Sequence, residues 1–276
     1  ATLIGDPPNI LIGSAAGIDF LTFAANLGPI TVLILLVFLG MCWFMFRRDV
    51  ERGDRRAADV ALLQAGALIT DARLLAKALI VISAVLLGFL IHGAVHLEPA
   101  TIALAGATVL LLWSRRDPQP VLQEIEWTTL FFFVGLFITV EAIVQVGIID
   151  GVAGAALRLT GGNLNVTATA VLWLSTLVSG IVDNIPYTTT MIPIVESLGQ
   201  TMPIEPLWWS LALGACLGGN TTLVGASANV VVADLAARSG HPIPFRVFLG
   251  YGLATALMSM LLSTAYLWLR YLLPLL

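Results

Sequence analysis

Long stretches of this 276-residue chain contain no charged side chain. The four longest run over residues 27–46, 159–182, 206–233 and 247–269. Each reaches the roughly 20 apolar residues that a helix needs to cross a hydrocarbon core about 30 Å thick. Apolar residues make up 58% of the chain and charged residues 11%, against about 45–50% and about 25% in soluble domains. We therefore predict an all-α, polytopic integral membrane protein that has the lipid bilayer as its solvent.

Shorter uncharged stretches complete the predicted organisation. In chain order it comprises the end of a first-repeat transport region with a broken helix (1–26), a linking transmembrane helix (27–46), a polar loop (47–73), second-repeat scaffold helices (74–147) and a second-repeat transport region (148–276). The last region is predicted to hold a re-entrant hairpin (163–199), a broken helix (206–236) and a final transmembrane helix (247–272). Because the chain begins abruptly inside a binding motif and shows no signal-peptide pattern, we expect a preceding part.

Basic residues indicate which loops face the cytoplasm. Lys and Arg concentrate around loop 47–73 and at the start of loop 115–126, with two predicted spans between them. Since positively charged loops stay inside, both loops are predicted to be cytoplasmic, and the membrane to be a bacterial inner (plasma) membrane. Arg238, His241 and Arg246 join that side only if 163–199 enters and leaves on the outer face, as a re-entrant hairpin does.

An internal repeat connects the two ends of the chain. Residues 2–12 (TLIGDPPNILI) align without gaps to residues 222–232 (TLVGASANVVV), with the Thr, Leu, Gly and Asn positions identical. In the predicted topology the first copy runs outward and the second inward. They are therefore predicted to be inverted repeats, the usual construction of secondary transporters.

Both copies of the repeat contain residues that interrupt a helix: a Gly and a Pro pair in the first, and a run of Gly, Ser and Thr in the second. Irregular backbone at membrane depth is tolerated only inside protein or beside a water-filled cavity. A broken helix offers carbonyl groups to a cation and amide groups to an anion. The candidate ligands here are Pro7, Asn9, Asn220, Thr221, Thr222, Ser227 and Asn229. Close helix packing through small residues is the alternative interpretation.

Two acidic residues lie at predicted membrane depth. Asp6 belongs to the first broken helix, and Asp183 stands at the corner of the hairpin, where a proline interrupts the helix. A carboxylate there costs about 2.5–3.5 kcal/mol and usually marks an ion or proton path. The alternatives are a helix cap for Asp183 and a water-exposed position for Asp6. The corner candidates are Asp183, Asn184, Pro186 and Thr188, and a Na⁺ ion is predicted at Asp183, Asn184, Thr222 and Asn229.

Other patterns exclude several classes of protein. The chain has no Walker A, HExxH, GxSxG or Rossmann fingerprint, so we predict no enzyme, no catalytic residue and no cofactor apart from a coupling Na⁺ or H⁺. Loop 47–73 alternates bases with acids, which argues against nucleic acid as a partner. Cys42 and Cys216 form neither a disulfide nor a metal pair. His92 and His96 flank a predicted outer turn and are interpreted as solvated.

Three segments together resemble the ion transporter superfamily: residues 1–9, 182–193 and 218–229. The most similar branch is that of the ArsB/NhaD and P-protein-like permeases, and the citrate and dicarboxylate symporters are more distant. The resemblance implies opposed re-entrant hairpins, two unwound helices and a homodimer. It also implies that 6–9 form the first unwound loop, that Asp183, Asn184 and Pro186 form the outer hairpin tip, and that Thr221, Thr222, Ser227 and Asn229 form the second unwound loop.

Three functions follow as hypotheses. The first is a secondary active transporter that moves a small anion, oxyanion or carboxylate with Na⁺ or H⁺. The second is a Na⁺/H⁺ antiporter, in which Asp6 and Asp183 are the exchanging ligands. The third is an arsenite-type efflux channel or the membrane subunit of a pump. The expected partners are the lipid bilayer, a small ion and a second copy of the chain.

Overall fold

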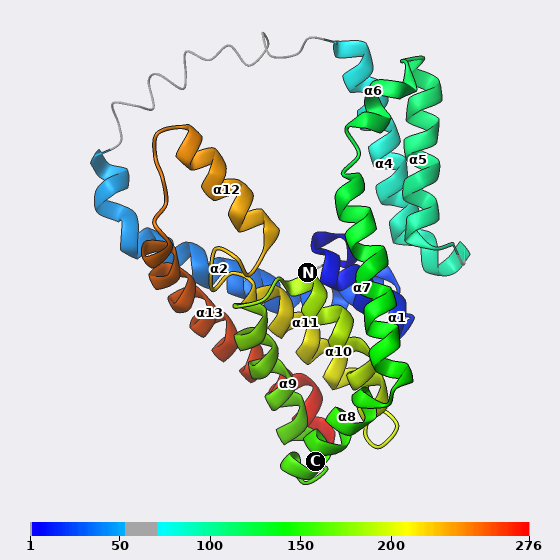
Figure 1. The fold of residues 1–276 in the computed structure, drawn as a ribbon. Coiled ribbons are helices and arrows are strands. Elements are labelled where there is room, and N and C mark those ends of the chain that lie inside the picture. The colour runs from blue at the N-terminus through cyan, green and yellow to red at the C-terminus, as the bar shows by residue number, and fades with distance from the viewer. Residues whose placement is uncertain (1, 53–70, 96, 276) are drawn as a thin grey trace. The chain divides into compact units, whose positions relative to one another are not determined.

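The computed structural model describes residues 2–52, 71–95 and 97–275, and within these ranges all regular structure is helical (Figure 1). Four helices are long and apolar enough to cross a membrane: Phe20–Arg47, Ala72–Val95, Trp127–Gln145 and Phe245–Leu272. The predicted all-α class of polytopic membrane protein is confirmed. The chain divides into two compact units, the first with Ala1–Ile18, Thr22–Ile34 and Thr128–Leu276, the second with Asp19–Leu21 and Leu35–Trp127.

In the second unit, α4 (Ala72–Val95) packs against α5 (Pro99–Ser114). Two glycines permit the close approach. A Cβ atom on Gly88 would stand 2.7 Å from the side chain of Ile102, and one on Gly106 would stand 2.2 Å from that of Val85. Any larger residue at these positions would push the helices apart, because helix interiors are already close-packed.

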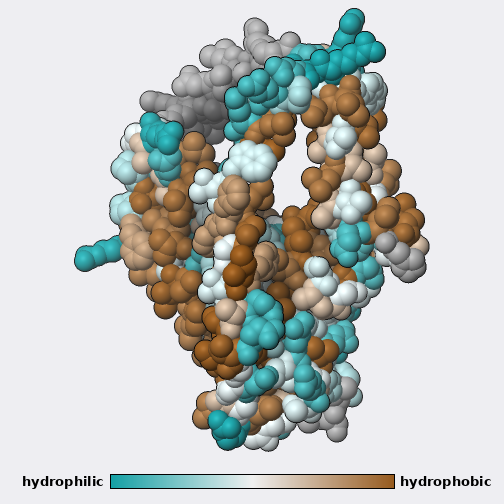
Figure 2. Space-filling view, turned by 45° about the vertical axis from the view of Figure 1, so that its right-hand side comes forward, coloured by the Kyte–Doolittle hydropathy of each residue, from teal (hydrophilic) through white to brown (hydrophobic). Residues whose placement is uncertain are grey.

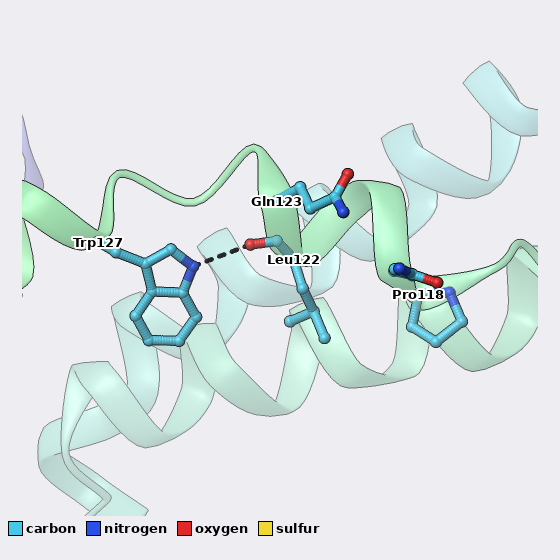
Figure 3. A pocket seen from close by; sticks show the side chains of 5 residues that line it. Pro118, Leu122, Gln123 and Trp127 are labelled. Carbon is cyan, nitrogen blue, oxygen red and sulfur yellow. Dashed lines mark hydrogen bonds between the residues drawn. The ribbon is translucent and has the colours of Figure 1, made fainter.

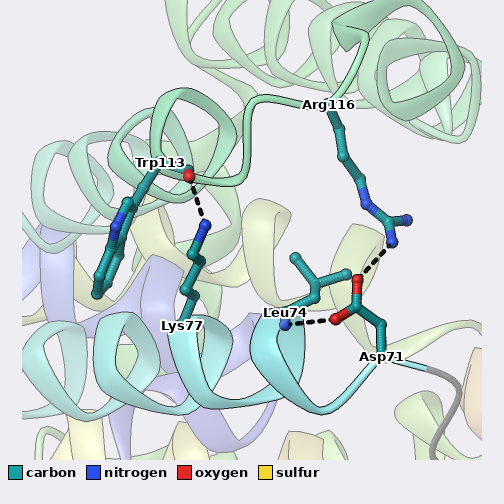
Figure 4. Close-up of polar contacts among 5 residues, drawn as sticks. All are labelled: Asp71, Leu74, Lys77, Trp113 and Arg116. Carbon is teal, nitrogen blue, oxygen red and sulfur yellow. Dashed lines mark hydrogen bonds and ion pairs between the residues drawn. The ribbon is translucent and has the colours of Figure 1, made fainter.

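Polar contacts join the first turn of α4 to the end of α5 (Figure 4). Arg116 forms an ion pair with Asp71 at 3.3 Å, and Lys77 Nζ donates to the carbonyl oxygen of Trp113 at 2.8 Å. The backbone N–H of Leu74 donates to the Asp71 carboxylate at 2.9 Å and holds the pKa of that exposed carboxyl below its usual value. Asp71 therefore caps the start of α4 as a carboxylate.

Loop 115–126 contains a short helix, α6 (Pro118–Gln123), which was not predicted. Trp127 Nε1 donates to the carbonyl oxygen of Leu122 at 3.0 Å, so the indole is fixed beside this helix (Figure 3). The two together line an open hollow of about 540 Å³. Its lining carries no acidic or basic side chain, so the hollow is a poor candidate for an ion site.

The first unit contains most of the interrupted helices. Its elements are a 3₁₀ turn (Leu3–Gly5), α1 (Pro7–Ala16), part of α2 (Phe20–Arg52), α7 (Trp127–Gln145), α8 (Ile148–Thr160), α9 (Leu164–Ser179), α10 (Asn184–Leu198), α11 (Glu205–Gly218), α12 (Ser227–Arg238), α13 (Phe245–Leu267) and a π turn (Trp268–Leu272). The predicted hairpin corresponds to α9 and α10, and the predicted second broken helix to α11 and α12. The path of the hairpin through the bilayer stays a prediction.

Helix α11 is the most buried helix of this unit and packs against α9. A Cβ atom on Gly214 would stand 2.5 Å from the carbonyl oxygen of Leu172, and one on Gly218 would stand 2.6 Å from backbone atoms of Thr176. The two glycines are four residues apart on α11, the spacing that lets membrane helices approach backbone to backbone. Small residues therefore do serve packing here, at positions outside the repeat.

Two elements differ from the predicted bounds. Helix α2 extends beyond the predicted span 27–46 at both ends, and its polar end reaches Arg52 within the predicted loop 47–73; residues 53–70 of that loop lie outside the described residues. Helix α8 was not predicted. It lies between Gly147 and Gly161, whose φ angles of 75° and 63° are the left-handed values that favour glycine at helix ends.

Apolar side chains cover the outer surface of the long helices. Leu104, Leu112 and Phe131 are 69%, 73% and 72% exposed. Figure 2 shows hydrophobic side chains spread over the helices, with hydrophilic ones gathered towards the ends. Exposed apolar patches on this scale are rare on soluble monomers, so these faces require lipid or another protein surface.

Candidate functional site

Three interruptions of the helices come together in the first unit. They comprise residues 2–6, 180–183 and 219–226, called break 1, break 2 and break 3 below, and they precede α1, α10 and α12. Two hydrogen bonds between side chains connect them. Asn184 Nδ2 donates to Asp6 Oδ2 at 3.1 Å, and Ser227 Oγ donates to Asp183 Oδ2 at 3.0 Å. The starts of three helices and both predicted intramembrane acids thus form one site.

Breaks 2 and 3 lie directly against each other. The Thr222 hydroxyl donates to the carbonyl oxygen of Gly180 at 2.6 Å and accepts the Gly225 N–H at 3.1 Å. Glycine is required by the close approach, since a Cβ atom on Gly225 would stand 2.7 Å from the carbonyl oxygen of Gly219. Thr222 therefore fixes the shape of break 3 and its position against the hairpin corner.

Asn9 and Asn229, which the sequence repeat pairs, make the same hydrogen bond. Each donates its side-chain amide to the carbonyl oxygen of the repeat's first threonine, seven residues earlier, at 3.2 Å for Asn9 and 3.0 Å for Asn229. The residues that precede the two helices also share an extended backbone, with φ −160° and ψ 139° at Asp6 and φ −150° and ψ 139° at Ala226. The two copies thus share one local structure, in which asparagine holds the irregular turn.

The two carboxylates have different local roles. Asp183 Oδ1 accepts the Ile185 N–H at 3.0 Å, which is the helix cap that the sequence offered as an alternative to a site. Its other oxygen accepts from Ser227, so Asp183 is a cap and a member of the site together. Asp6 stands at the same position before α1 but does not cap it; its carboxylate faces Asn184 instead. Neither acid forms an ion pair with Lys or Arg in the described ranges.

Five predicted residues lie beside this network without a side-chain hydrogen bond into it. Pro7 and Pro186 lie in the first turns of α1 and α10, and Asn220 is exposed. The buried hydroxyl oxygens of Thr188 and Thr221 have no hydrogen-bond partner in the described part of the chain. An unpaired buried hydroxyl costs free energy, so these two groups are open to an ion or a solute.

The sequence did not point to two further residues of the site. Cys216 donates its thiol to Asn9 Oδ1 at 3.2 Å, across 207 residues of chain. Gly252, on α13, lets that helix pass close to break 3, because a Cβ atom there would stand 2.3 Å from the carbonyl oxygen of Thr221. Cys216 lies one helical turn before break 3. This closeness to a predicted break is the sequence feature that could have indicated it. Gly252 carries no such signal.

The donor atoms of the site suit an alkali cation better than a transition metal. Among the described residues, no group of three or more His, Cys, Asp or Glu could hold a metal ion. All four predicted Na⁺ ligands lie in the site, but the Thr222 hydroxyl is already used twice within the backbone. The side-chain amide of Asn229 likewise donates to the carbonyl oxygens of Gly219 and Thr222. The other oxygen atoms of the site belong to carboxylate and backbone carbonyl groups, which hard cations prefer.

Comparison with known proteins gives a consistent picture. Residues 1–214 match the family model described as citrate transporter, CitMHS. Proteins named as uncharacterized transporters in Mycobacterium bovis and Mycobacterium tuberculosis are 43% identical over 275 residues, which cover 98% of this chain and 64% of each relative. The P protein of Mus musculus is 36% identical over 250 residues, 86% of this chain and 30% of that protein. The chain therefore spans somewhat less than two thirds of the bacterial relatives.

Proposed function

Because this chain belongs to the citrate transporter family, we propose that it works as a secondary active transporter for a small anion, an oxyanion or a carboxylate such as citrate, coupled to Na⁺ or H⁺. The observation that carries the proposal is the meeting of three helix starts with two carboxylates through the Asn184–Asp6 and Ser227–Asp183 hydrogen bonds. Amide groups at helix starts attract an anion, whereas carboxylates attract a cation or a proton. One site thus offers complementary binding to both partners of a symport.

The charges of the site support coupling to a cation. Among the described residues no Lys or Arg pairs with either acid, so an anion that entered alone while both acids carry their charge would meet two negative groups. Like charges a few ångströms apart repel strongly in a medium of low dielectric constant. Prior binding of Na⁺ or H⁺ removes that repulsion, so we propose that the cation binds first.

A Na⁺/H⁺ antiporter is the second candidate, and the presence of both Asp6 and Asp183 in the site favours it. In that case the two carboxylates alternate between Na⁺ and protons, and no anion takes part. Intramembrane carboxylates serve as proton relays in many pumps and transporters.

Flux measurements on the purified protein in liposomes distinguish these functions. Labelled citrate, phosphate, arsenite and chloride are offered under an imposed Na⁺ or pH gradient, without ATP. Uphill uptake of one anion that collapses with an ionophore supports the symporter. Proton movement driven by Na⁺ alone supports the antiporter. Flux that only dissipates gradients, or that needs ATP and a partner protein, identifies a channel or pump subunit and contradicts both proposals.

Variants of the acids locate the coupling. Asp183→Asn keeps a cap acceptor for α10 but loses the charge, so we expect Na⁺- or H⁺-driven flux to fall by at least about tenfold while the fold is kept. Asp6→Asn should act in the same direction. Asp234→Asn is the matched control, since the ion-pair partner of that exposed carboxylate in the described part of the chain is Arg238, one turn away. Equal activity of all three variants would remove the carboxylates from the mechanism.

The molecule is an integral membrane protein, and three finer features belong to the proposal. We propose a bacterial inner membrane, cytoplasmic positions for loops 47–73 and 115–126, and a homodimer. The basic residues of these loops support the orientation, and the exposed apolar faces of α5 and α7 support a protein partner. Labelling of single cysteines placed in the two loops, from the inside and the outside of vesicles, tests the orientation. Light scattering in detergent tests the dimer.

A further inference from the structure

The junction between the two units lies directly after α1. The chain leaves the first unit at Ile18 and enters the second at Asp19, and α2 begins one residue later. Within the second unit, the N–H of Phe20 donates to Nε2 of His92 at 2.9 Å. That N–H is one of the four at a helix start that have no partner in the helix itself. His92, 72 residues further along the chain, therefore caps α2 from another helix.

The hydrogen bonds of His92 fix its protonation. Nε2 accepts from an N–H, so it must carry a lone pair. Nδ1 lies 3.3 Å from the carbonyl oxygen of Leu97, which can only accept, so Nδ1 carries the hydrogen. Both bonds are satisfied by one neutral tautomer of the imidazole and by no other state. The interpretation of His92 as a merely solvated side chain is therefore incomplete.

A second proton on this ring is incompatible with the cap. It would sit on Nε2 and point at the Phe20 N–H, so two donors would face each other. The positive ring would also stand at the positive end of the helix dipole of α2. Phe89, one turn before His92 on α4, stacks on Phe20 with ring centroids 6.5 Å apart. That apolar contact does not depend on the proton, so the hydrogen bond alone responds to pH.

Two acidic residues lie on the segments next to His92. Asp19 lies beside the end of α4, with its Cβ 3.1 Å and its Cγ 3.6 Å from the place of a Cβ on Gly93. Glu98 stands at the N-cap position of α5 and makes no side-chain cap there. His96, in the same turn, lies outside the described residues. Asp19 and Glu98 are thus the acidic residues on the described segments next to His92.

We infer that His92 is a proton-sensitive positioning residue: neutral, it pins the first turn of α2 at the junction between the units, and protonated, it releases that turn. The junction follows α1 by a few residues, and α1 carries Asn9 and starts after Asp6. Acid on the face where His92 lies thus loosens the first turn of α2, which follows α1 along the chain. This inference does not rest on the proposed transport function.

Hydrogen–deuterium exchange of the peptide that covers residues 17–21 tests the inference on the whole protein. Protection is corrected for intrinsic exchange and compared at about pH 8 and about pH 5, the range in which histidine titrates. We expect wild-type protection to fall about fivefold in acid, the usual effect of losing an N-cap. His92→Gln keeps an acceptor that does not titrate, so its protection should be the same at both pH values. His92→Ala should be unprotected at both.

His241→Gln is the control, because the partner of the His241 ring among the described residues is the nearby carbonyl oxygen of Ser239; it should behave as wild type. Constant wild-type protection across the two pH values, or a His92→Gln variant that follows wild type, would overturn the inference. Nitrogen NMR of labelled imidazole provides a readout that needs no variant. It should find His92 with its hydrogen on Nδ1 at about pH 8, and the opposite tautomer would contradict the geometry.

Discussion

Replacing Asn229 with Ala tests whether a single side chain holds break 3. The substitution removes two hydrogen bonds, to the carbonyl oxygens of Gly219 at 2.9 Å and Thr222 at 3.0 Å. Side-chain hydrogen bonds in membrane proteins contribute about 0.6 kcal/mol on average, and those in soluble proteins about 1 kcal/mol. Because Asn229 is only partly buried, water reaches the released carbonyls and limits the penalty. We expect the free energy of unfolding to fall by about 1–2 kcal/mol.

Two measurements separate this local effect from a general loss of stability. Equilibrium unfolding in mixed detergent micelles gives the change in free energy, and hydrogen–deuterium exchange over residues 219–226 gives the local opening. Asn163→Ala is the matched control, since Asn163 also makes two hydrogen bonds, to the amides of Asn165 and Val166 at the start of α9. It should cost about 1 kcal/mol as a lost cap without changing exchange in break 3.

For Asn229→Ala, exchange in break 3 should rise by roughly 5–30-fold, which corresponds to the expected loss of free energy. If citrate or Na⁺ flux is measured in parallel, it should be lower in the variant, because break 3 is less ordered. The reasoning fails if exchange over 219–226 stays within about twofold of wild type, or if Asn163→Ala raises it to the same extent.

Two further predictions concern packing and pH. Gly252→Ala places a methyl group 2.3 Å from the carbonyl oxygen of Thr221, so thermal unfolding in detergent should show a loss of about 1–3 kcal/mol; Gly250→Ala, with nothing within 4 Å, should be neutral. The pKa of the Asp71 carboxyl is lowered by the Leu74 N–H, so its cap is fully present above the unfolded pKa of about 3.9 and is lost as the pH falls through the folded value. Protection of the first turn of α4 should therefore decrease in acid in wild type and stay constant in Asp71→Asn; the same decrease in both would contradict this.

The long helices were predicted well from the sequence, because a helix that crosses the bilayer needs about 20 mostly apolar residues. The predicted scaffold stretch 74–147 contains α5 and α7, and the predicted hairpin corner at Asp183 falls between α9 and α10. Helix α8 escaped prediction because it is short and only one of its faces is buried. The close packing of α11 on α9 escaped it too: the Gly214–Gly218 pair is visible in the sequence, but which helix it meets is not.

In the candidate site, local hydrogen bonds were predictable from the sequence, whereas contacts between distant segments were not. The repeat was sufficient to pair Asn9 with Asn229, since a repeated sequence that builds the same turn needs the same local hydrogen bond. Contacts between distant segments left no such trace: nothing in the sequence joins Asn184 to Asp6 across 178 residues, or Phe20 to His92 across 72. In lipid, a broken helix must find partners for its polar groups within the protein. Each break was therefore predictable by itself. The contacts between breaks meet the same requirement, because Asn184 donates to Asp6 and Thr222 donates to the carbonyl oxygen of Gly180.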